Sequence, residues 1–185
     1  NRQTGSSNEQ NVFVVDIESV NTSGKNKALK MDTTNDLLKQ ESEIIIRTLK
    51  EQLGEAVGEL ENSAYASTGG KVKLRLLVNG VDHEALHTAL DEAGRNVVKE
   101  IGNIPANSPE FPDVKTVSDI RHPKEPGDDN KAGAGIFYTS IKMTPDLSAE
   151  KALGIADLIS EAKMDRGLSI DESRDAAVAA ERRNS

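Results

Sequence analysis

The segment 72–78 constrains the fold of this chain more than any other. Its apolar side chains recur at every second position, and Lys73 and Arg75 stand between them. A period of two is typical of a strand that buries one face. Asn79-Gly80 then indicates a turn. An amphipathic helix is predicted directly after it, at about 82–101, with Asp82 as its N-cap. The apolar positions of this helix are Leu86, Ala89, Leu90, Ala93, Val97 and Ile101.

The remaining elements are predicted by the same patterns. Apolar, β-branched runs indicate strands at 11–19 and 136–143, and a less regular one at 113–122. Apolar residues at three-, four- and seven-residue steps from Leu38 to Leu60 predict a long helix, and further helices are expected at about 147–165 and 169–183. The order is β-α-β-α-β-β-α-α. It predicts an α/β (α+β) fold, a mixed sheet of about four strands with helices packed on one face.

We expect three parts along the chain. Residues 1–10 are polar and are predicted to be disordered, 11–166 to form a single α/β domain, and 167–185 to form a C-terminal helix. Within the domain, 71–165 reads as a strand-helix-strand-strand-helix unit. The apolar face of the helix predicted at 169–183 consists only of alanines and a valine. So small a face packs weakly within its own domain, which favours docking onto a partner or another subunit.

The composition excludes several functions. A formal charge of −8 disfavours a surface that grips a phosphate backbone, so no nucleic-acid partner is expected. No stretch is apolar enough for a membrane span, so the chain is expected to be soluble. The absence of cysteine excludes disulfides, thiolate metal ligands and thiol catalysis, but it is equally compatible with the cytoplasm and the periplasm.

Residues 83–87 read His-Glu-Ala-Leu-His, in a chain with three histidines. Two histidines four apart on a helix project from one face and can both bind one Zn²⁺, while the intervening glutamate acts as general base. The pattern therefore nominates His83 and His87 as metal ligands and Glu84 as a catalytic base.

In these five residues the chain resembles the zincin superfamily of metallopeptidases, and that resemblance implies zinc-dependent peptide hydrolysis. It does not extend further, because Leu90 and Ala93 stand where a longer zincin signature has glycine and histidine. A third ligand is required, and the candidates are Asp91 and His122. The alternative is that both histidines lie at the rim of an ordinary amphipathic helix whose N-terminus Glu84 supports by its charge.

Since no complete catalytic set is visible, the sequence favours a non-enzymatic structural or interaction domain of a larger bacterial or phage assembly. Such a domain would use no cofactor and would act through a protein partner or self-association. The alternative is a zinc-dependent metallopeptidase built on 83–87, with zinc as its cofactor.

Overall fold

An antiparallel sheet with strand order β2-β3-β1-β4 forms the centre of the protein. The computed structural model describes residues 11–20, 22–59, 73–121 and 133–166. Within them the strands are β1 Val12–Ser19, β2 Val57–Glu59, β3 Lys73–Asn79 and β4 Ile136–Lys142. The helices are α2 Thr22–Ala28, α3 Met31–Leu53, α4 His83–Ile101 and α5 Ala149–Arg166, with 3-10 turns η1 Gly54–Ala56 and η2 Val117–Asp119.

The strand β1 is central, because it pairs with β3 on one side and with β4 on the other. Val15 is in register with Leu76 of β3 and with Ser140 of β4. The burial of β1 is nearly complete from Phe13 to Ser19. A strand covered on both faces is expected to be apolar throughout, so the charged residues within β1 need a local explanation.

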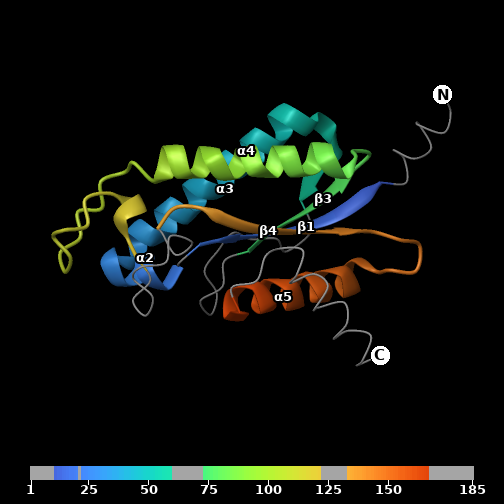
Figure 1. Cartoon of the computed structure of the whole chain (residues 1–185). Coiled ribbons are helices and arrows are strands. Elements are labelled where there is room, and N and C mark those ends of the chain that lie inside the picture. Colours follow the sequence, from blue (N-terminus) through green and yellow to red (C-terminus); the bar gives the residue numbers. More distant parts are fainter. Residues whose placement is uncertain (1–10, 21, 60–72, 122–132, 167–185) are drawn as a thin grey trace.

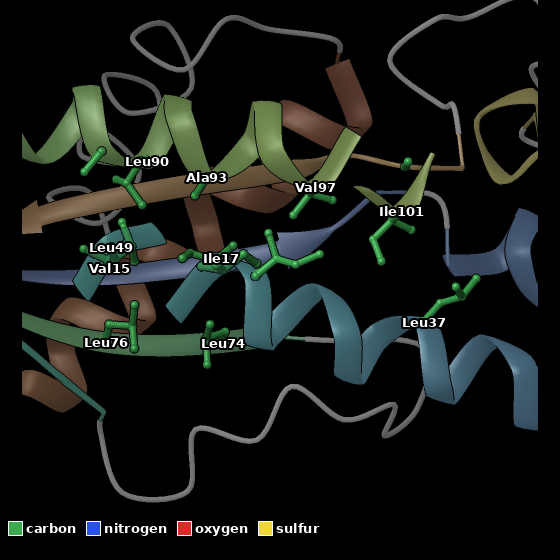
Figure 2. Packing of buried hydrophobic residues seen from close by; sticks show 14 of the residues in the cluster. Val15, Ile17, Leu37, Leu49, Leu74, Leu76, Leu90, Ala93, Val97 and Ile101 are labelled. Atoms are coloured by element: carbon green, nitrogen blue, oxygen red, sulfur yellow. The ribbon is translucent and has the colours of Figure 1, made fainter. Parts of the chain in front are cut away.

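Helices cover both faces of the sheet (Figure 1). Helices α3 and α4 pack against each other above one face, and α5 lies across the opposite face. The principal apolar core fills the layer between the sheet and the α3–α4 pair, where Val15 and Ile17 of β1 meet Leu49, Leu90 and Val97 (Figure 2). The sheet therefore has one face packed on a two-helix layer and one face packed on α5.

Helix α4 begins and ends where the sequence predicted. The Asp82 carboxylate accepts a hydrogen bond from the amide of Ala85 at 2.7 Å, which satisfies one of the free amides of the first turn. All six apolar positions predicted for its inner face are buried.

The predicted α+β class and the sheet of four strands are confirmed. Two details differ from the prediction. The pairs between the described strands are all antiparallel, where a mixed sheet was expected, and α5 occupies the face that was expected to lack helices.

Three local predictions are wrong. The long helix ends at Leu53, because Gly54 has a positive φ of 61°, and Val57–Glu59 pairs with β3. Between the first strand and the long helix, where the sequence patterns predicted no element, residues Thr22–Ala28 form α2. Within 113–121 there is a 3-10 turn in place of a strand, because the Asp119 carboxylate accepts hydrogen bonds from the amide and hydroxyl of Thr116.

The predicted division into 1–10, 11–166 and 167–185 stays a prediction, since both terminal segments lie outside the described residues. Among the helices that are described, none combines the length and the apolar character needed to cross a membrane.

Candidate functional site

The structure brings His83 and His87 together on α4. Their ring centroids are 3.9 Å apart with the planes tilted by 34°, as the four-residue spacing predicted. The Nε2 atom of His87 lies 3.0 Å from the Ser140 hydroxyl on β4, and its ring meets that of Tyr138 edge-on. The two histidines thus lie between the first turns of α4 and the strand β4.

Asp91, which the sequence suggested as a third metal ligand, is hydrogen-bonded to Tyr138. Its Oδ1 accepts a hydrogen bond of 2.6 Å from the hydroxyl of Tyr138. Burial, together with this carboxylate, raises the pKa of Tyr138 above its ordinary value. Glu84 is exposed in the first turn of α4, and His122 lies outside the described residues. No group of three histidine, aspartate or glutamate side chains able to hold a metal gathers among the residues that the structure describes, so the metal-ligand role of His83 and His87 stays a prediction.

A second cluster, on β1, was missed by the sequence analysis. Asp16 and Glu18 lie two residues apart and so project from the same face of the strand, the one opposite the α3–α4 layer. They are 1% and 7% exposed. The Oδ1 atom of Asp16 lies 3.7 Å from Nε of its cross-strand neighbour Arg75, and Nη2 of Arg75 lies 3.7 Å from Oδ1 of Asp157 on α5. Arg75 is thereby shared by a buried carboxylate and a half-exposed one.

The carboxyl end of β1 carries a further buried network, which joins the strand to α2 and α3. The Lys25 ammonium donates to the Ser19 hydroxyl at 2.6 Å, and that hydroxyl donates to Oε2 of Glu41 at 2.8 Å. The Lys25 Nζ atom lies 3.8 Å from the same Glu41 oxygen, and both side chains are fully buried. Buried charges persist in folded proteins when they are paired and hydrogen-bonded in this way.

Burial dominates the electrostatics of this pair. It lowers the pKa of Lys25 below its ordinary value, and the adjacent Glu41 carboxylate opposes part of that effect. It raises the pKa of Glu41, against the opposing influence of the Lys25 charge and the Ser19 hydrogen bond. The carboxyl end of β1 is therefore joined to α2 and α3 by a buried network of charged and hydroxyl groups.

One sequence signal for this site existed. Asp16 and Glu18 interrupt an otherwise apolar strand at positions i and i+2, a spacing that places both carboxylates on one face of the sheet. Lys25 and Glu41 gave no such signal, since lysine and glutamate on a helix are ordinarily solvated.

Comparisons with known proteins give a likeness of fold. No known protein family matches the sequence, and no curated protein matches it at a significant level. Among solved structures, the chain is similar to the GGDEF domain of DgcB from Caulobacter crescentus in complex with c-di-GMP. The TM-score is 0.56 at 12% identity, over 89% of this chain and 80% of that one.

A second structure, which contains the coiled coil and GGDEF domain of the same protein in complex with c-di-GMP, has a TM-score of 0.58 at 12% identity, over 91% of this chain and 73% of that one. At this level of identity the likeness shows the fold alone.

This fold corrects the functional prediction. The neighbours are ligand-binding GGDEF domains, so the prediction of a non-enzymatic structural or interaction domain of an assembly is wrong. The alternative, a zinc-dependent metallopeptidase at 83–87, is wrong for the same reason, and no site among the described residues supports zinc.

Proposed function

We propose that this domain binds a guanine nucleotide of the c-di-GMP class at the carboxyl end of β1. The observation that carries the proposal is the likeness over 89% of the chain to a domain solved with c-di-GMP. The position of the proposed site is inferred from the buried carboxylates of Asp16 and Glu18 on β1. Buried ionisable groups are concentrated at functional sites.

The chemistry of the cluster adds a requirement for a divalent cation. Asp16 and Glu18 carry the same sign of charge as a nucleotide phosphate, so a cation between them is needed for close approach. Mg²⁺ suits this role, since it is bound by one or two carboxylates and completes its shell with water and phosphate oxygens. The residues fit this ion: both offer hard oxygen donors on one face of one strand, and both are held by a buried strand.

The protein's own residues would then divide the work. Glu18, nearer the end of the strand, would hold the ion, and Asp16 would hold it in part while its orientation is fixed by Arg75. The Lys25–Ser19–Glu41 network would hold the end of β1 against α2 and α3. Mg²⁺ would supply the positive charge that neutralises the phosphate.

Isothermal titration calorimetry with c-di-GMP tests the proposal. We expect saturable binding in the presence of MgCl₂ and none in EDTA. Glu18→Gln preserves the shape of the side chain and removes its charge, and it should weaken binding by about 10- to 100-fold, as expected for the loss of a charged interaction. The matched control is Glu43→Gln on the exposed face of α3, which should bind as the wild type does. Binding that ignores both EDTA and Glu18→Gln would refute the proposed site, and the absence of any binding would refute the proposed ligand.

Self-association forms part of the proposal. The ligand c-di-GMP is two-fold symmetric, so two copies of one domain can present the same groups to its two halves. Size-exclusion chromatography with light scattering should show a larger mass when c-di-GMP is added. An unchanged mass with bound ligand would limit the site to one protomer.

A further inference from the structure

A groove lies at the other end of β1, away from the charged cluster. Its volume is about 490 Å³, within the range of small-molecule sites. It is formed where the first residues of β1, the last residues of β4, the N-terminus of α4 and the middle of α5 meet. Because β4 is an edge strand of the described sheet, the groove extends around that edge and opens to solvent on one side.

The floor and walls of the groove are apolar. Phe13, Ile141 and Ile155 line it, from β1, β4 and α5 respectively. Phe13 is 2% exposed and belongs to the core, so this wall is fixed by packing on the α3–α4 side. An apolar surface of this kind accommodates an aliphatic or aromatic body.

The remaining lining residues of the groove are polar, and Lys142 among them is basic. His83 and Lys142 line it together with the neutral side chains of Asn11 and Ser140. None of the described lining residues is acidic, although the chain as a whole carries a charge of −8. Lys142 is exposed and stands opposite Phe13 in the β1–β4 register.

The N-terminus of α4 also borders the groove. His83 is the first residue of a 19-residue helix, whose N-terminal end carries a partial positive charge. The two carboxylates next to His83 in sequence do not line the groove, and that of Asp82 accepts a hydrogen bond from the amide of Ala85. Lys142 is therefore the lining group that favours an anion, since Asp82 and Glu84 offset the partial charge of the helix end.

We infer that this groove is a second binding site, for a small organic anion with an apolar body, such as an aryl carboxylate or sulfonate. The body would lie against Phe13, Ile141 and Ile155, and the anionic group would face Lys142 and the start of α4. The site is separate from the proposed nucleotide site, which involves the opposite end of β1, and it does not depend on that proposal.

Two fluorescent probes that differ only by a sulfonate group test this inference. They are 8-anilinonaphthalene-1-sulfonate and its neutral parent N-phenyl-1-naphthylamine, titrated into the full chain. The sulfonate should bind with one-site saturation, and about fivefold more tightly than the neutral probe, as expected for one solvent-exposed charge pair. Equal affinities for the two probes would overturn the inference.

Variants separate the two halves of the site. Lys142→Met should reduce sulfonate binding to the level of the neutral probe and leave the neutral probe unchanged. Ile155→Ala should weaken both probes, because the apolar wall serves both. The control Lys99→Met removes an exposed lysine from the last turn of α4 and should change neither. If Lys99→Met reduced sulfonate binding as much as Lys142→Met, the effect would be one of overall charge and the groove would not be the site.

Chemical-shift mapping of the backbone amides locates the bound probe directly. With the sulfonate present, the largest changes are expected at Phe13, His83 and Ser140. Changes centred on the far end of β1, at Glu18 and Ser19, would overturn the assignment of this groove.

Discussion

The Nζ atom of Lys25 lies 3.8 Å from Oε2 of Glu41, and neither side chain has any exposed surface. The Ser19 hydroxyl accepts a hydrogen bond from the lysine and donates one to the glutamate. A buried pair of this kind adds little net stability, because desolvation offsets the attraction, but the loss of one partner leaves an uncompensated charge in the interior.

Removal of both partners is therefore expected to cost less than the sum of the two separate removals. Lys25→Met or Glu41→Gln alone should lower the free energy of unfolding by about 3–5 kcal/mol. The double variant should lose less than the sum of the two, with a coupling of about 1–3 kcal/mol. Urea unfolding of the wild type, the two single variants and the double variant measures this coupling. Additive losses of the free energy of unfolding would show that the two groups do not interact.

Asp82 is expected to contribute through its cap of α4. Asp82→Ala should lower the free energy of unfolding by about 1 kcal/mol, because the amide of Ala85 loses its acceptor. Asp82→Ser retains an oxygen at the same place and should restore most of the loss. Thermal unfolding followed by circular dichroism compares the three proteins, and equal stability of the alanine variant would contradict the role of the cap.

Two glycines are expected to respond in opposite directions to alanine. A Cβ at Gly133 would lie 2.1 Å from the carbonyl oxygen of Val117 and 2.9 Å from Cβ of Ile120, so the backbone must shift, at a cost of about 1–3 kcal/mol. A Cβ at Gly154 within α5 would meet nothing within 4 Å, and Gly154→Ala should gain about 0.5–1 kcal/mol. Chemical denaturation of both variants checks the pair, and a stable Gly133→Ala would contradict the close approach of these segments.

Asp119 is expected to make stability depend on pH. Hydrogen bonds from the amide and hydroxyl of Thr116 lower the pKa of this carboxyl. A group whose pKa is lower in the folded state stabilises the fold above its unfolded pKa, and the contribution is lost as the pH falls through its folded pKa. Asp119→Asn should thus have a lower Tm than the wild type at pH 7, and the difference should shrink in acid. A difference that is constant from neutral to acid pH would show that the charge of Asp119 has no part in it.

The fold was predictable where periodicity was strong. The strand β3 and the helix α4 follow patterns of 2 and 3.6 residues, and both were located within a few residues. The prediction failed where local hydrogen bonds or short pairings decide, as in Val57–Glu59 and around Thr116 and Asp119. The three residues of β2 are too few to show a periodic pattern. Around Thr116, the hydrogen bonds between the Asp119 side chain and the nearby backbone compete with an extended conformation.

The candidate site was predictable only in part. The spacing of His83 and His87 predicted their contact, but not the absence of a third ligand among their described neighbours. Lys25 and Glu41 were missed because the sequence pattern assigns charged residues to the solvent, whereas the tertiary structure pairs them in the interior.

The two faces of β1 also bear on how the sheet assembles. If β1 paired with its neighbours one residue out of step, Asp16 and Glu18 would enter the layer occupied by Leu49 and Leu90, and Val15 and Ile17 would turn towards α5. Two carboxylates would then be surrounded by aliphatic side chains. The charged positions of this strand thus penalise every odd-numbered misalignment during folding, and they help to select a single pairing for the strand on which the whole sheet depends.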